Sequence, residues 1–318
     1  MVKSGSAMIE LPNLDTKDNN NHSHLQMIVQ NKALRRRVIF GGFSLTALIS
    51  RLPNAVAQTR PPVKRGLALA LGGGAARGFA HVGVIEVLEA NGIRPEWVVG
   101  TSAGSLVGAL YASGMSLTEL RKQALALDES ALGDWTITGR APIKGEYLER
   151  LVNRLIGTKP MEAFELKFAA VATDLFNGKP IYFSRGNAGQ AVRASSSVPG
   201  VFEPVSISGR DYVDGGLVAP IPVSAARALG ARKVIAVDIS AKPRFQATDS
   251  LAQVFLQTFA IMGQQLGSQE MALADIAISP ETGDLSATDF AQRSRMIEEG
   301  QRATTLLIPA IQRLLASF

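Results

Sequence analysis

Two hydrophobic patterns alternate along this chain. Short apolar runs bounded by glycine or polar residues are typical of buried β-strands, and apolar residues at every third or fourth position are typical of helices that cover a sheet. The predicted strands are Leu67–Leu71, Trp97–Val99, Phe168–Thr173, Ile181–Phe183 and Val234–Ile239. The predicted helices are 79–91, one beginning near Ser105, 117–127, 146–156, 224–229, 251–274 and 289–315, the last with an interruption at Pro309. This alternation predicts an α/β fold of three layers (α/β/α), with a mainly parallel central sheet between helices.

Two finer expectations follow from the same pattern. Asn177-Gly178 lies between two predicted strands and favours a hairpin, so these strands are expected to pair antiparallel. Met262 and Met271 belong to the predicted helix 251–274, and apolar residues at helical spacing usually pack inward. Both methionines are therefore expected in the core.

A candidate nucleophile lies between a predicted strand and a helix, in Gly100-Thr101-Ser102-Ala103-Gly104. A serine at such an elbow needs glycine on both sides, because the turn strains its backbone and larger side chains collide with the strand and the helix. The following helix points backbone N–H groups toward the reacting oxygen. The alternative is a small-residue cluster where a helix packs closely on a sheet.

A glycine-rich loop follows the strand Leu67–Leu71 and precedes a helix. Its sequence, Gly72-Gly73-Gly74-Ala75-Ala76-Arg77-Gly78, leaves backbone N–H groups to face an anion, either a nucleotide phosphate or an oxyanion. Arg77 occupies the place of the last glycine of a dinucleotide motif, and G-x-x-x-x-G-K-[ST] is absent, so an oxyanion is favoured. Arg77 either locks the loop, the preferred interpretation, or attracts an anionic head group.

None of the three histidines is an evident base for the activation of Ser102. His22 and His24 lie in a polar leader, and His81 lies on the helix after the glycine loop, where packing is its expected role. No histidine follows the serine, which excludes the α/β-hydrolase order. The remaining bases are carboxylates or a lysine. Four aspartates lie at strand ends or within strands, where such a sheet presents its chemistry: Asp174, Asp211, Asp214 and Asp238. By itself, Asp214-Gly215-Gly216 is more typical of an ordinary turn.

Three blocks in order resemble the signature motifs of patatin-like phospholipases: the glycine loop 72–78, Gly100–Gly104 and Asp214–Gly216. Further stretches resemble the bacterial branch of that family, which is related to the catalytic domain of neuropathy target esterase. These stretches are Ala172–Leu175, Ala194–Pro199 and Phe202–Val205, and the similarity covers about residues 64–312. Three blocks in order are far more specific than any one of them.

The resemblance implies a patatin-like fold and a Ser–Asp dyad without histidine, with Ser102 as nucleophile and Asp214 as base. It also implies that Asp174 is structural. The tetrahedral oxyanion would be held by the backbone N–H groups of Gly72, Gly73 and Gly74. The supporting residues would be Arg77, Gly100, Gly104, Gly215 and Gly216.

Composition and charge narrow the functional classes. The chain has 318 residues, 46% of them hydrophobic, and a net charge of +6. Residues 1–57 contain seven Lys and Arg against three Asp and Glu, so the remainder is nearly neutral and its charge gives no support for nucleic-acid binding. The absence of cysteine excludes thiolate chemistry and a lipoprotein anchor, and no metal-ligand spacing or cofactor motif is evident.

Residues 1–57 are predicted to be a leader, followed by one hydrolase domain over 58–318. Arg35-Arg36-Arg37 precede an uncharged run from Val38 to Ile49, and Ala55-Val56-Ala57 offers an export cleavage site before Gln58. The run is too short to span a bilayer comfortably. The pattern predicts export to the periplasm or medium, by the general or the twin-arginine route, with Met27 as an alternative start. If the leader is a disordered tail instead, a cytoplasmic location is expected.

The resulting expectation is a serine acyl hydrolase that cleaves lipid carboxylic esters, like a phospholipase or lysophospholipase, at a membrane surface. Acyl transfer to another alcohol shares the first chemical step. The alternative is a catalytically silent lipid or nucleotide binder that uses the glycine loop as its anion site.

Overall fold

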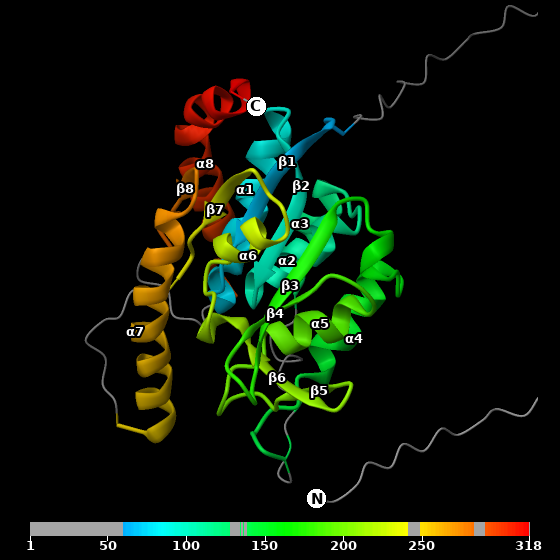
Figure 1. Cartoon of the computed structure of the whole chain (residues 1–318), viewed down its shortest axis with the longest axis vertical. Helices are drawn as coiled ribbons and strands as arrows, with labels where there is room; N and C mark the ends of the chain where they lie inside the picture. The colour runs from blue at the N-terminus through cyan, green and yellow to red at the C-terminus, as the bar shows by residue number, and fades with distance from the viewer. Residues whose placement is uncertain are drawn as a thin grey trace, which may run out of the picture. The chain divides into compact units, whose positions relative to one another are not determined.

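One mixed sheet runs through the part of the chain that is described, with helices packed on it (Figure 1). The computed structural model describes residues 60–127, 134, 136, 139–240, 249–282 and 290–317. The strands are β1 (Val63–Leu71), β2 (Arg94–Thr101), β3 (Lys167–Asp174), β4 (Pro180–Phe183), β5 (Val205–Ile207), β6 (Arg210–Asp214), β7 (Lys233–Val237) and β8 (Ile276–Ile278). The α-helices are α1 (Phe79–Ala90), α2 (Ala103–Ala112), α3 (Leu117–Leu125), α4 (Glu146–Ile156), α5 (Ala188–Ser195), α6 (Val223–Ala228), α7 (Leu251–Ala272) and α8 (Arg293–Ala316). Short 3-10 turns are η1 (Ala75–Gly78), η3 (Met161–Ala163), η4 (Gly215–Leu217) and η5 (Phe290–Gln292).

The strand order places the ends of several strands together. The order is β5-β6-β3-β2-β1-β7-β8, and β4 also pairs with β3. Strands β1, β2, β3, β7 and β8 run parallel, whereas β4 and β6 run antiparallel to β3. Leu71 lies beside Gly100 on one side and Val237 on the other, so the carboxyl ends of β1, β2 and β7 meet at one edge. That edge is where a parallel α/β sheet presents its chemistry.

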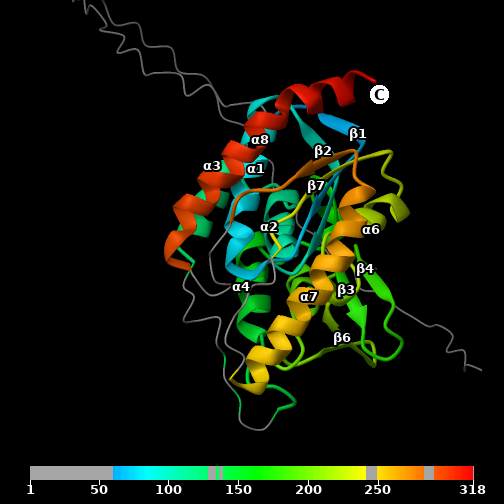
Figure 2. The same ribbon diagram turned by 90° about the vertical axis from the view of Figure 1, so that its left-hand side faces the viewer.

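Alternation along β1 divides the core into two layers. Leu67, Leu69 and Leu71 pack with apolar residues of α1, α2 and α8, whereas Ala68 and Ala70 pack with the α6 side of the sheet. Successive side chains of a strand point to opposite faces, so this one strand contributes to both layers. Figure 2 shows α1 and α8 on one side of the strands and α6 on the other. The predicted three-layer α/β fold with a mainly parallel sheet is confirmed.

The predicted hairpin is confirmed, whereas the predicted break in the last helix is not. Strands β3 and β4 pair antiparallel, with Ala172 opposite Ile181. Pro309 lies inside a continuous α8, so the predicted interruption is wrong. Proline removes the bond to the carbonyl four residues earlier, on Thr305, and both residues lie on the exposed side, where water can replace that bond.

Met262 is not in the core. Its side chain is 47% exposed, whereas Met271 is partly buried and packs against the α6-side layer. The expectation for Met262 is wrong because α7 turns Gly267 toward Ile221 and leaves larger side chains outside.

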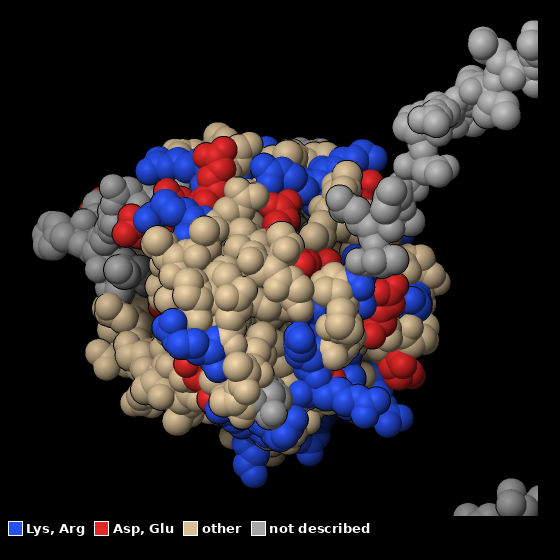
Figure 3. Space-filling model, turned by 90° about the horizontal axis from the view of Figure 1, so that it is seen from above, with Lys and Arg blue, Asp and Glu red and all other residues tan. Residues whose placement is uncertain are grey.

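Residues 57–318 form a compact unit of their own. The predicted leader, with its export signal and the alternative start at Met27, lies outside the described residues. Charged side chains of both signs are interspersed on the face shown in Figure 3, in keeping with the near-neutral charge that the sequence has after residue 57.

Candidate active site

Ser102 lies at the turn between β2 and α2. Its φ of 52° is in a region that non-glycine residues rarely adopt, a strain typical of a nucleophile elbow. A side chain at Gly104 would place Cβ 2.1 Å from the carbonyl oxygen of Leu71, and one at Gly100 would place it 2.4 Å from the carbonyl oxygen of Gly104. A Cβ at Gly73 would lie 3.3 Å from that of Ser102, so the glycine loop lies directly against the serine. The turn therefore requires the small residues that surround it.

Asp214, at the end of β6, is in hydrogen-bonding contact with Ser102. Its side chain accepts a hydrogen bond from the Ser102 side chain and another, of 2.6 Å, from the N–H of Gly216. The carboxylate also caps η4, so the aspartate both forms the turn and reaches the serine. A Cβ at Gly215 would lie 2.2 Å from the carbonyl oxygen of Val171 on β3, and this close approach requires glycine.

Burial changes the acidity of Asp214. The residue is 2% exposed, and burial raises the pKa of its carboxyl to about 6, although the hydrogen bonds from Gly216 and Ser102 lower it. Desolvation penalises the charged form, and the hydrogen bonds favour it. A carboxylate whose pKa is near 6 is a better proton acceptor than an ordinary aspartate and remains ionised at neutral pH.

The other strand-end carboxylates have other partners. Asp174 binds Arg210 and two N–H groups of its own turn, Asp211 binds Arg140, and Asp238 accepts the N–H of Ser240. Among these four described aspartates, only Asp214 is hydrogen-bonded to Ser102.

Ser195 received no role in the sequence analysis, but in the structure it forms a hydrogen bond with the backbone of the elbow. Its hydroxyl accepts the backbone N–H of Ser102 at 2.9 Å and donates to the carbonyl of Val171 at 2.5 Å. The residue is fully buried. The only signal in the sequence was its place in the block Ala194–Pro199, which resembles the family, and that block does not show what its serines contact.

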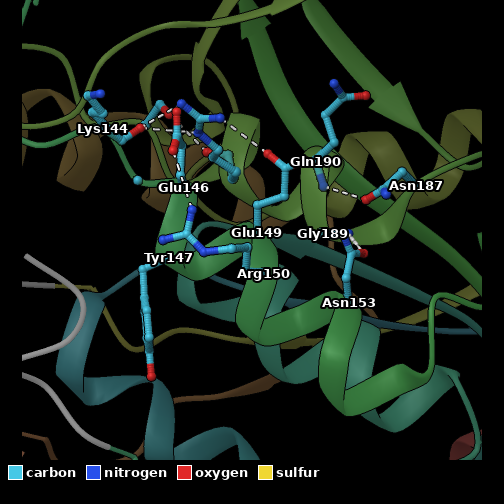
Figure 4. Close-up of polar contacts among 12 residues, drawn as sticks. Lys144, Glu146, Tyr147, Glu149, Arg150, Asn153, Asn187, Gly189 and Gln190 are labelled. Atoms are coloured by element: carbon cyan, nitrogen blue, oxygen red, sulfur yellow. Dashed lines mark hydrogen bonds and ion pairs between the residues drawn. The ribbon is translucent and has the colours of Figure 1, made fainter. Parts of the chain in front are cut away.

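Helix α5, which ends at Ser195, is attached to α4 by polar contacts (Figure 4). Asn153 accepts the N–H of Gly189, and Glu149 forms an ion pair with Arg193 at 3.2 Å. Asn187 caps the start of α5 by accepting the N–H of Gln190. These contacts fix the position of α5, and therefore of Ser195, which is hydrogen-bonded to Ser102.

The glycine loop leaves fewer free N–H groups than the sequence predicts. The N–H of Gly72 donates to the carbonyl of Val237 at 3.0 Å, and that of Gly73 donates to the carbonyl of Pro220 at 2.9 Å. No described residue accepts a hydrogen bond from the N–H of Gly74. The assignment of all three glycines to an oxyanion hole is therefore corrected, because two of the donors hold the loop in place.

Two buried side chains also hold this loop. The Nε of Arg77 donates to the carbonyl of Ile239 at 2.9 Å, a locking contact of the kind preferred from the sequence. The Nε2 of His81 lies 2.8 Å from the carbonyl oxygen of Gly72, and burial lowers the pKa of this imidazole to about 4. His81 is thus neutral at pH 7, donates through Nε2 to that carbonyl and packs against the loop, as expected.

The site is built from one hydroxyl, one buried carboxylate and nearby backbone N–H groups. Within the described ranges, no three His, Asp or Glu side chains lie together as a metal site requires. Such an arrangement is suited to nucleophilic attack by a serine.

Comparison with known sequences identifies the family. The profile of the patatin-like phospholipases matches residues 69–227, which include the glycine loop, the elbow and Asp214. The chain belongs to the patatin-like phospholipase family. An uncharacterized NTE family protein of Mycobacterium tuberculosis is 35% identical to this patatin-like chain over 187 residues, 58% of this chain and 52% of the relative. The lysophospholipase NTE1 of Yarrowia lipolytica is 33% identical over 179 residues, 54% of this chain and 12% of that protein.

A solved structure shares the patatin-like fold. VipD from Legionella pneumophila has a TM-score of 0.52 at 16% identity, and the match covers 76% of this chain and 66% of that chain. The chain spans about half the length of the mycobacterial relatives that it matches.

Proposed function

We propose that this patatin-like domain hydrolyses lipid carboxylic esters, with Ser102 as the nucleophile and Asp214 as the base. The observation that carries the proposal is the hydrogen bond between the Ser102 side chain and a buried carboxylate. Membership of the family, and a relative named as a lysophospholipase, support a lipid ester as the substrate class.

The first step is attack of Ser102 Oγ on the ester carbonyl carbon, while the hydroxyl proton passes to Asp214. The carbonyl oxygen then carries the negative charge of a tetrahedral intermediate. When the intermediate collapses, the proton returns from Asp214 to the leaving alcohol, and the acyl group stays on Ser102.

Two N–H groups are proposed to stabilise the oxyanion. One is the N–H of Gly74, for which no described residue is an acceptor, and the other is the N–H of Ala103, the first residue of α2. The first N–H groups of a helix have no intrahelical acceptor and lie at its positive end. Removing one donor from such a hole typically lowers the rate by roughly 10² to 10³.

Water completes the reaction by attacking the acyl-serine while Asp214 accepts one of its protons. The bond from the carbonyl carbon to Ser102 Oγ then breaks, the proton returns from Asp214 to Oγ, and the fatty acid is released. A single carboxylate must serve both the nucleophile and the leaving group. Esters suit this arrangement better than amides, because an alkoxide leaves more readily than an amide nitrogen, which must be protonated by an acid before it can leave.

A fluorophosphonate probe and an ester assay test the assignment. We expect wild-type protein and Ser113→Ala, a matched hydroxyl at the far end of α2, to be labelled and to hydrolyse p-nitrophenyl butyrate. Ser102→Ala should lose both properties, and Asp214→Asn should be labelled much more slowly. Folded wild-type protein without labelling would favour a silent binder, and labelling of Asp214→Asn at the wild-type rate would exclude Asp214 as base. Adding a competing alcohol separates hydrolysis from acyl transfer.

We also propose that residues 1–57 direct export. The support is the arginine cluster, the uncharged run and the Ala55–Ala57 site in the sequence. Sequencing the amino terminus of protein recovered from the periplasm or medium should give Gln58. Protein that retains Met1 or Met27 would contradict a cleaved signal.

A further inference from the structure

Helix α7 has a row of large apolar side chains on its outer surface. Val254, Phe255, Ile261 and Met262 are 42% to 48% exposed. Val254 and Ile261 are seven residues apart, as are Phe255 and Met262, and seven residues make about two helical turns. Each pair forms a row along the helix, and the two rows lie about 100° apart on its exposed side; together we call them the α7 apolar face.

The rest of the protein uses little of this face, where Phe255 alone lies near another segment, with its ring 3.8 Å from where a Cβ of Gly200 would be. Helix α7 packs against η4 and α6, and Gly267 is a point of close approach, where a Cβ would lie 3.3 Å from the Ile221 side chain. The start of the helix is held by a capping box between Ser250 and Gln253. The helix is thus positioned by its other side and its N-terminus, and nothing in this packing requires an apolar outer surface.

The chemistry of α7 differs from that of an ordinary solvent-facing helix. No charged residue occurs from Leu251 to Gln269. Helix α8 has a similar length and carries six, Arg293, Arg295, Glu298, Glu299, Arg302 and Arg313. A helix in water usually has charged residues on its outer face, so this contrast indicates a surface adapted to an apolar neighbour.

The same helix borders the proposed catalytic dyad. The ring of Phe259 lies 3.2 Å from where a Cβ of Gly216 would be, and Gly216 donates to Asp214. Phe255 approaches Gly200 in the same way, at 3.8 Å. Figure 2 shows α7 in front of the strands, with its C-terminal end beside α6.

We propose that the α7 apolar face docks on a lipid surface, so that lipid esters reach Ser102 from that surface. This inference rests on the proposed function, because only a lipid substrate requires the edge beside Ser102 and Asp214 to face lipid. None of the described helices is long and apolar enough to cross a bilayer, so the contact is interfacial. With no charge between Leu251 and Gln269, apolar burial must supply the binding, and anionic lipid is not required.

A fluorophore on the face gives a readout that is independent of catalysis. The chain has no cysteine, so a single Met262→Cys can be labelled with bimane in the otherwise intact protein. Leu306→Cys is the matched control, on α8 and 70% exposed. On adding phosphatidylcholine vesicles, we expect a blue shift, and quenching by doxyl-labelled lipid, at position 262 only. The absence of a spectral change at 262, or equal changes at both positions, would overturn the proposal.

Vesicle flotation measures the contribution of the face. We expect Ile261→Gln/Met262→Gln to bind phosphatidylcholine vesicles at least about 10-fold more weakly than wild type, because two half-exposed apolar side chains no longer enter the lipid. Leu306→Gln should bind as wild type. Both variants should hydrolyse soluble p-nitrophenyl butyrate normally, and the double variant should lose activity on vesicle lipid only.

The failures of the two proposals are distinguishable. Ser102→Ala should float as wild type, so an inactive dyad leaves the docking result intact. Flotation of the double variant at the wild-type level overturns docking without affecting the esterase assignment. A wild-type dimer that does not bind vesicles and that dissociates in the double variant would assign the face to a second copy, and would also overturn docking.

Discussion

The hydroxyl of Ser195 holds the backbone of Ser102 by accepting its N–H at 2.9 Å. It simultaneously donates to the carbonyl of Val171, on the strand next to the one that leads into the elbow. The strained nucleophile is therefore tied to β3 through one buried hydroxyl from α5. Strained backbone persists only where its surroundings determine it strongly, and Ser195 is one of those constraints.

Replacing Ser195 with alanine should leave the N–H of Ser102 without its acceptor. We expect the free energy of unfolding to fall by about 1–3 kcal/mol, because a buried N–H loses its hydrogen bond. We also expect kcat/KM for a soluble ester to fall roughly 10-fold to 100-fold, because the elbow is no longer held in place. Urea unfolding and steady-state kinetics measure the two effects. Ser113→Ala, which removes a hydroxyl bonded to Leu110 on the same helix as the elbow, should leave kcat/KM unchanged. Equal rates for Ser195→Ala and wild type would mean that the elbow is held without this bond.

Activity should follow the ionisation of Asp214. Burial raises the pKa of its carboxyl to about 6, and only the ionised form accepts the serine proton. We expect kcat/KM on p-nitrophenyl butyrate to fall about 10-fold for each pH unit below 6 and to level off above it. The pKa of His81 is lowered to about 4, so histidine does not account for a midpoint near 6. A midpoint near 4 would indicate an aspartate of ordinary acidity.

Asp214→Asn should stabilise the protein at alkaline pH while abolishing hydrolysis. Because the pKa of Asp214 is higher in the folded protein than in the unfolded chain, its stabilising effect is complete below pH 3.8 and is lost as the pH rises through about 6. Removing the buried charge should therefore raise the unfolding free energy at pH 8 by on the order of 2 kcal/mol. The gain should shrink toward pH 4. Urea unfolding at both pH values measures it, and a less stable variant at pH 8 would mean that the hydrogen bonds to the carboxylate outweigh its burial.

Two glycine-to-alanine substitutions should have opposite effects on the stability of the fold. In Gly104→Ala the new Cβ meets the carbonyl oxygen of Leu71 at 2.1 Å, so we expect loss of soluble folded protein or of activity. In Gly263→Ala on α7 nothing lies within 4 Å of the new Cβ, and alanine favours helix by about 1 kcal/mol. Thermal unfolding should show a small increase in Tm for Gly263→Ala. A well-folded, fully active Gly104→Ala would contradict the close approach at the elbow.

Most elements were predictable because their patterns are local. The runs Leu67–Leu71 in β1 and Val234–Val237 in β7 are continuous and apolar, and the apolar residues of α4 recur at helical spacing. Met262 was misplaced because periodicity shows that a helix has an apolar face but not whether another element covers it. The glycine loop was misjudged for a similar reason, since the carbonyls that engage Gly72 and Gly73 come from Val237 and Pro220, far along the chain.

The residue types at the elbow, the glycines around it and the absence of any histidine after Ser102 are properties of the sequence itself. They determined that a serine without an imidazole partner was the candidate nucleophile. Residue patterns left four strand-end aspartates as candidates and the family resemblance named Asp214, but only the tertiary structure shows how this carboxylate reaches the serine: β6 pairs antiparallel with β3 and sets Asp214 opposite Ala172, beside the end of β2. Tertiary structure also decided the acidity of that carboxylate, since burial depends on everything packed around the group, and no local pattern encodes it.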